Sequence, residues 1–229
     1  MPALTTVLQK HQLQFFPVVK FDPLNDKLLA MDFTAANEQL SDELLADTAL
    51  FSDYIKSAVD AAGARYGIGG YGEHRTIYSR STHFNAKDEP RRLHLGTDIW
   101  GPAGTPVFAF QGGMVHSVAY NDHFGDYGAT MILSHQLDTL SFYTLYGHIS
   151  KKDIGSLWPG RYLMRGQEIA HFGVPDENGH WPPHLHFQII SDMGMREGDY
   201  PGVCKFSEKE KWMAACPDPD LILQMNKYL

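Results

Sequence analysis

The pattern of apolar positions divides the chain into a helical first part and a β-rich remainder. From Ser41, apolar residues recur largely at helical spacing. These residues are Leu44, Leu45, Leu50, Phe51, Tyr54, Ile55 and Val59. Asp42 and Glu43 suit the start of a helix, and Gly63 suits its end. We therefore expect one or two amphipathic helices that pack on the domain that follows.

Past Arg75 the pattern changes to short apolar runs separated by glycine and proline, which is typical of antiparallel sheet proteins. Residues 105–110 and 114–120 flank Gln111-Gly112-Gly113 and predict a hairpin. Further strands are expected at residues 130–134, 141–146 and 185–190.

The sequence contains no internal repeat and no linker rich in proline or serine, so both parts are expected to form one compact body. We assign residues 1–92 to an N-terminal helical extension packed on the β-rich domain, residues 93–190 to that domain, and residues 191–229 to a C-terminal extension. The expected fold is mainly β with an antiparallel sheet, and α+β overall once the helical extension is included.

The charge balance narrows the class of partner. The sequence has 19 Lys and Arg against 27 Asp and Glu, a net charge of -8, so we expect no binding of nucleic acid through a broad basic surface. Residues 1–20 lack the apolar stretch of a secretory signal, and no apolar run reaches the ~18 residues of a membrane span. We therefore expect a cytoplasmic protein without a membrane span; no pattern indicates an oligomeric state.

Two short motifs carry metal-binding side chains. His184-Leu185-His186 begins a predicted strand, where residues two apart project from one face. Upstream, His94 and Asp98 lie four positions apart, with Gly96 between them to allow a bent backbone. An isolated His-x-His motif is more often structural, but the two motifs together supply more than the three protein ligands of a catalytic zinc site.

His148 adds a third imidazole at the end of a predicted strand. The order His94-x-x-x-Asp98, Tyr146-Gly147-His148 and Pro183-His184-Leu185-His186-Phe187 resembles the lysostaphin/LytM-like (M23) metallopeptidases. Segments 106–109, 112–115 and 165–170 also resemble that family, so the likeness spans about residues 93–190. It implies a sheet like the duplicated hybrid motif of M23 enzymes.

The resemblance also implies roles for these residues. His94, Asp98 and His186 would bind zinc, and His148 and His184 would remain unligated as catalytic residues. A zinc-activated water would then hydrolyse a peptide bond. One of the two free imidazoles would act as general base, and the other would stabilise the oxyanion or protonate the leaving amine.

A peptide or peptidoglycan-like substrate is implied by the family alone. Because the sequence shows no route out of the cytoplasm, a zinc-binding domain that acts on another cytosolic substrate, or is catalytically silent, remains an alternative. Glucose-type IIA domains of the sugar phosphotransferase system resemble this β architecture and carry two active histidines. A histidine phosphocarrier is less favoured, because it needs no set of five convergent metal-site residues.

Two residues outside the motifs receive structural interpretations. Arg75, which ends the glycine-rich segment 69–75, is expected to form a surface ion pair; contact with a substrate carboxylate is the alternative. His135 follows a predicted strand and is expected to have a structural role at a turn.

Overall fold

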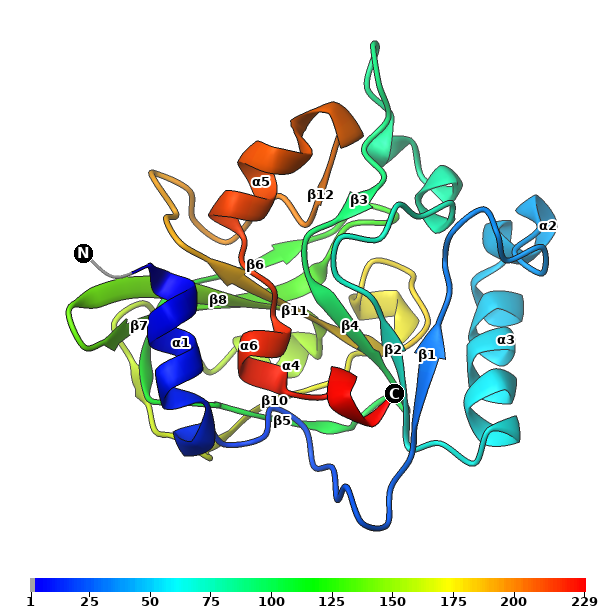
Figure 1. Ribbon diagram of the computed structural model, residues 1–229. Coiled ribbons are helices and arrows are strands. Elements are labelled where there is room, and N and C mark those ends of the chain that lie inside the picture. The colour runs from blue at the N-terminus through cyan, green and yellow to red at the C-terminus, as the bar shows by residue number, and fades with distance from the viewer. Residues whose placement is uncertain (1–2) are drawn as a thin grey trace.

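The computed structural model describes residues 3–229, and Met1 and Pro2 lie outside the described residues. Within residues 3–229, eight strands form one large sheet (Figure 1). In spatial order they are β1 (Leu28–Met31), β2 (Tyr66–Gly69), β4 (Thr97–Trp100), β11 (His184–Ile190), β8 (Leu140–Ile149), β7 (Gly128–Leu137), β6 (Gly113–Asn121) and β9 (Tyr162–Leu163). Neighbouring strands are antiparallel except β1 and β2, so the expected mainly β, antiparallel fold is confirmed with one parallel pair.

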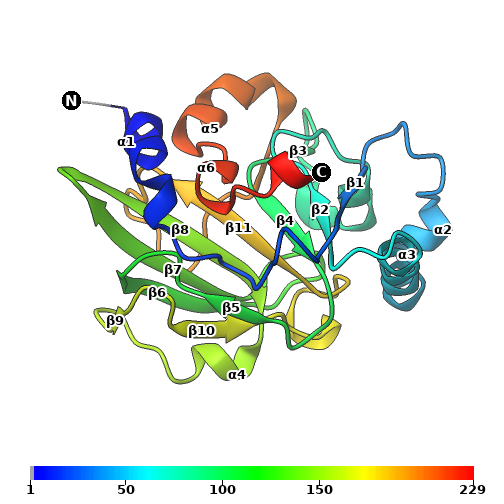
Figure 2. The same cartoon turned by 60° about the horizontal axis from the view of Figure 1, so that its bottom comes forward.

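Two short ribbons accompany this sheet. One pairs β5 (Pro106–Phe108) with β10 (Glu168–His171), and the other pairs β3 (Leu93–His94) with β12 (Val203–Cys204). Figure 2 shows the β5–β10 ribbon and the short helix α4 on one side of the molecule, opposite the helices near the two chain ends. The β3–β12 ribbon joins the C-terminal segment directly to the strand that carries His94.

The helices lie mostly outside the β-rich region. They are α1 (Leu4–His11), α2 (Asp42–Ala46), α3 (Thr48–Ala61), α4 (Lys151–Ile154), α5 (Lys209–Ala215) and α6 (Asp220–Leu223). One or two helices are expected after Ser41, and the structure has two, α2 and α3; Ser41 Oγ accepts the Leu44 N–H at 3.1 Å and caps α2. None of the helices in the described part of the chain has the length and apolar character that crossing a bilayer requires.

The N-terminal part is not purely helical, because it also supplies β1 and β2 to the large sheet. Each strand has four residues, too few for a clear alternation of apolar and polar positions. The Met31 side chain packs directly over Gly67, where a Cβ would lie 2.8 Å from Met31 Cγ. Contacts between residues so far apart in the sequence leave little trace in the local sequence pattern. The division of the chain at residues 92 and 190 stays a prediction.

The hairpin predicted around Gln111-Gly112-Gly113 is wrong. β5 pairs with β10, whereas β6 pairs with β7 and β9. Gly112 and Gly113 do not have the positive φ of a tight hairpin turn. A Cβ on Gly113 would instead lie 2.7 Å from His135 Cε1 and 2.9 Å from the Ser134 carbonyl oxygen, so close packing requires this glycine.

Packed side chains fill both faces of the sheet around the centre where β4, β11 and β8 meet. An aromatic cluster between α3 and the sheet includes Phe33, Phe51, Trp100 and Trp181. Burial of such large side chains is a major stabilising term and fixes the sheet position against α3. The candidate site lies at the edge of this cluster, so its side chains rest on a rigid wall.

Candidate active site

The sheet register brings the two metal-binding motifs together. Asp98 on β4 lies directly opposite His186 on β11, and His94 lies at the end of the short strand β3. Gly96 lies between β3 and β4 in the sequence, and a Cβ at this position would lie only 2.4 Å from His186 Cε1. Its φ is not positive, so the glycine is required by the approach of the His186 ring and not by a left-handed turn.

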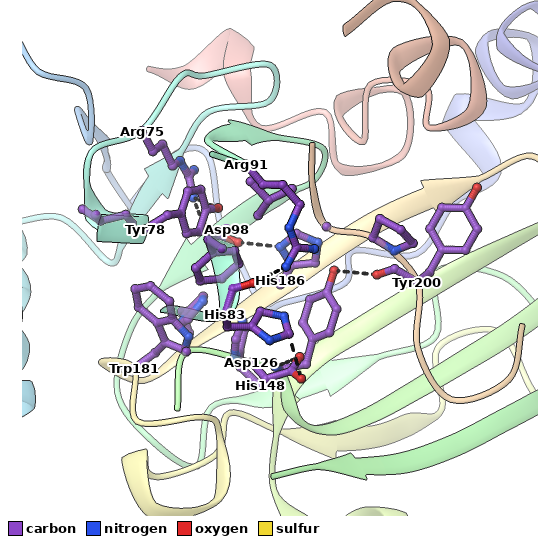
Figure 3. Close-up of a pocket in the computed structure, with 18 of the residues that line it drawn as sticks. Arg75, Tyr78, His83, Arg91, Asp98, Asp126, His148, Trp181, His186 and Tyr200 are labelled. Carbon is purple, nitrogen blue, oxygen red and sulfur yellow. Dashed lines mark hydrogen bonds and ion pairs between the residues drawn. The ribbon is translucent and has the colours of Figure 1, made fainter. Parts of the chain in front are cut away.

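Three candidate ligand atoms from these residues meet in the interior. Figure 3 shows two of the three residues, Asp98 and His186, next to each other. His94 Nε2 and His186 Nδ1 are 3.0 Å apart, and Asp98 Oδ1 is 3.0 Å from His186 Nδ1 and 3.3 Å from His94 Nε2. All three residues are buried. The candidate ligands named from the sequence therefore share one point in space.

The hydrogen-bond partners of the two rings indicate which nitrogens are free. His94 Nδ1 lies 3.0 Å from the Gly70 carbonyl and donates to it, which leaves Nε2 without a proton. Gln188 Nε2 donates to Pro201 O, so Gln188 Oε1 accepts from His186 Nε2 at 2.9 Å and leaves Nδ1 bare. Two bare nitrogens and a carboxylate oxygen at such distances repel one another unless a cation lies between them. The donor set present here thus fits a metal ion.

The electrostatics of the site keep His94 and Asp98 in the protonation states that metal binding requires. Burial lowers the pKa of His94 to about 4, with a further contribution from Arg75. Burial alone would raise the pKa of Asp98, but His94 and Arg75 hold it well below its usual value. Near neutral pH, His94 is therefore neutral and Asp98 is ionised.

His148 and His184 form a second pair beside this group, with ring centroids 4.1 Å apart. Their Nδ1 atoms each lie 2.7 Å from a backbone carbonyl, of Asn178 and Pro182 respectively. Each ring thus donates through Nδ1 and presents a bare Nε2. His148 also has φ 61°, a left-handed conformation that is uncommon outside glycine and asparagine and often marks functional residues.

Burial determines the charge of this pair as well. It lowers the pKa of His184 to about 4 and, together with the neighbouring His184 and His186, holds the pKa of His148 well below its usual value. The His184 ring stacks on Trp100 at 3.9 Å between centroids, which fixes its plane. Both imidazoles are neutral near pH 7 and able to accept a proton.

A pocket opens over these groups, and its walls come largely from segments outside the predicted β-rich domain. Tyr78, Phe84 and Arg91 line it from the N-terminal side, and residues 199–203 line it from the C-terminal side. Figure 3 shows Tyr78, Arg91 and Tyr200 among these lining residues. Arg91 and the carboxylates of Asp126 and Asp199 give the pocket charges of both signs. A ligand of this pocket therefore meets residues of both extensions.

Two residues differ from their sequence interpretation, and a third residue was missed. The prediction that Arg75 forms a surface ion pair is wrong, because its side chain is fully buried against Asp98. His135 is structural but lies inside β7 instead of at a turn, bonded to Gly112 O and Thr144 Oγ1. Gln188 was missed, although residues 184, 186 and 188 form a polar series on one face of an otherwise apolar strand.

Comparison with known proteins relates this arrangement to one enzyme family. The sequence model of peptidase family M23 matches residues 92–197. The L-Ala–D-Glu endopeptidase of Bacillus subtilis is 32% identical over 148 residues, which cover 59% of this chain and 43% of that protein. The peptidoglycan DD-endopeptidase ShyB of Vibrio cholerae is 26% identical over 215 residues, covering 89% of this chain and 46% of that protein. The chain thus spans less than half the length of either relative.

Among solved structures, the catalytic domain of lysostaphin from Staphylococcus simulans is similar, with 19% identity, coverage of 70% of this chain and 96% of that domain, and a TM-score of 0.41. A zinc-containing peptidase from Vibrio cholerae is 30% identical where the two align, over 43% of this chain and 27% of that one, with a TM-score of 0.35. The family match and the endopeptidase relatives support a peptidase. Residues 92–197 are thus similar in sequence to peptidase family M23.

Proposed function

We propose that the chain is a zinc-dependent peptidase that hydrolyses an amide bond in a peptide of peptidoglycan type. The observation that carries the proposal is the convergence of three buried acceptor atoms, from His94, Asp98 and His186, without a donor among them. Two imidazoles and one carboxylate are a common ligand set of catalytic zinc, and they leave a position for substrate. The substrate class rests on the relatives, whose names specify peptidoglycan and L-Ala–D-Glu bonds.

Zinc, when bound, supplies a Lewis acid that polarises the scissile carbonyl and lowers the pKa of a water molecule. Residues of the chain transfer the proton that this water molecule loses. His148 or His184 accepts it at the bare Nε2, and the charged ring then donates it to the leaving amine. The carbonyls of Asn178 and Pro182 hold each Nδ1–H in place, so neither ring turns during the transfer.

The spacing of the His148 and His184 rings supports a mechanism in which the two rings share a single proton. With centroids 4.1 Å apart in a buried site, a charge on one ring opposes a charge on the other. Only one of His148 and His184 is therefore expected to be protonated at a time, so one proton passes between water and amine. Their burial excludes the bulk solvent that would weaken this coupling.

The proposal is tested by removing and restoring the metal. The purified protein is stripped with a chelator and assayed by mass spectrometry on D,D-cross-linked muropeptides and on L-Ala–D-Glu peptides. Cleavage is expected to vanish and to return with about one equivalent of zinc, and His186→Ala should not recover. Cleavage that persists without metal would refute the mechanism. Zinc binding without cleavage of either peptide would favour the silent or cytosolic-substrate alternative.

A further inference from the structure

Arg75 is a buried cation in direct contact with a candidate metal ligand. Its side chain is fully buried, and its Nη1 lies 2.5 Å from Asp98 Oδ2. The remaining donors are also used: Nε bonds Glu73 Oε2 at 2.7 Å, and Nη2 bonds Gly70 O at 3.3 Å. The guanidinium therefore has a fixed orientation. It belongs to the N-terminal segment, outside residues 92–197 that match the family.

The two oxygens of Asp98 consequently have different surroundings. Oδ1 faces His94 Nε2 and His186 Nδ1, whereas Oδ2 faces Arg75. A carboxylate that is free on both oxygens can bind a metal through one or both of them. The Arg75 contact occupies Oδ2 with a charge-assisted bond and leaves Oδ1 for the metal.

The charge of Arg75 does not itself attract a metal. A guanidinium next to the site repels a divalent cation, so a role in raising metal affinity through charge is ruled out by its sign. Its contribution must be the orientation of the carboxylate. Groups that orient a ligand commonly affect metal affinity or activity by about 10–100-fold.

We propose that Arg75 is a positioning residue that restricts Asp98 to one metal-binding oxygen and so keeps a coordination position open for substrate. The inference rests on the proposed zinc site. It also makes the segment before residue 92 a working part of the centre, because both Arg75 and Gly70 fix the ligands Asp98 and His94.

The variants must distinguish the positioning of Asp98 from a purely structural role of Arg75. Arg75 pairs with the partly buried Glu73 and lies 5.2 Å from the Phe33 ring centroid, so its loss alone would leave the Glu73 carboxylate unpaired and destabilise the fold. The double variant Glu73→Gln/Arg75→Met avoids this, since the amide introduced at position 73 keeps an oxygen for the Phe33 N–H. The matched control is Glu73→Gln, in which Arg75 still holds Asp98.

Three measurements on each protein decide the question: the zinc dissociation constant from chelator competition, the visible spectrum of the cobalt(II)-substituted protein, and the melting temperature. Cobalt(II) absorbs more strongly with four ligands than with five or six. The double variant is expected to bind zinc within about threefold of the wild type or more tightly. Its cobalt absorbance should fall as Asp98 binds through both oxygens, and turnover should fall by about 10–100-fold. Glu73→Gln should keep the wild-type spectrum.

An unchanged cobalt spectrum in the folded double variant would overturn the inference, as would a tenfold loss of zinc affinity that accounts for all lost activity. If the double variant does not fold, Arg75→Lys decides, because one ammonium cannot bond both carboxylates in the geometry of the guanidinium. The cobalt absorbance should then fall with little change in melting temperature, and an unchanged spectrum again overturns the inference. Failure of the wild type to bind zinc would instead refute the proposed metal site, whatever the variants do.

Discussion

Gly96→Ala should weaken metal binding although it changes no ligand. The new Cβ would lie 2.4 Å from His186 Cε1, 2.5 Å from His186 Nε2 and 2.9 Å from the Phe187 carbonyl. Optimal carbon–carbon contacts are about 3.5–4.0 Å. The His186 ring must therefore move by on the order of 1 Å, which would break its 2.9 Å hydrogen bond to Gln188.

The size of the expected loss in zinc affinity follows from the strain that metal binding must overcome. Overpacking a tight site costs about 1–3 kcal/mol. Without metal the ring of His186 can swing away, so this strain appears mainly when the metal draws Nδ1 back into place. Because 1.4 kcal/mol corresponds to tenfold in a dissociation constant, zinc binding should weaken by roughly 10–100-fold.

The assay is chelator competition for zinc, with melting temperatures measured in excess chelator to confirm folding. Gly70→Ala is the matched control: its Cβ would meet only Glu73 Cβ at 3.9 Å, and its carbonyl remains available to His94. The control should bind zinc like the wild type. A Gly96→Ala protein with a zinc dissociation constant within threefold of the wild type would refute the packing argument.

Three further outcomes are expected. His148→Asn, which tolerates the positive φ, should keep its zinc and lose on the order of 100-fold or more in turnover; loss of zinc would make His148 a ligand. The pKa of His135, lowered by burial to about 4 from 6.5, implies stability that is present above pH 6.5 and lost as the pH falls toward 4. His135→Gln should accordingly remove about 2 kcal/mol of the loss between pH 8 and pH 5 in denaturant unfolding, and an unchanged pH slope would contradict this. Ser41→Ala should cost about 1 kcal/mol of unfolding free energy, and no measurable change would show that the Leu44 cap is unimportant.

The sequence predicted those parts of the protein in which local pattern and tertiary structure agree. The strands around residues 130–134, 141–146 and 185–190 exist, and the structure brings His94, Asp98 and His186 together. Side chains two apart on a strand must share a face, so the His-x-His geometry needed no knowledge of the fold.

The predictions were wrong where contacts between residues far apart in the sequence determine the structure. Gly112 and Gly113 signal a turn in isolation, yet Gly113 is required by its packing against His135, which lies elsewhere in the sequence. Arg75 follows a glycine-rich segment that indicates an exposed loop, but pairing of β2 with β4 brings that segment against Asp98. Neither contact has a local signature, because it depends on sheet pairings across many residues.

Anomalous X-ray diffraction from crystals grown with zinc, measured on both sides of the zinc absorption edge, tests the central claim most directly. The account predicts one peak in the region that the structure describes around His94 Nε2, Asp98 Oδ1 and His186 Nδ1, present above the edge and absent below it. No peak there, or a zinc peak held by other residues, would contradict the assignment of this site as the metal centre.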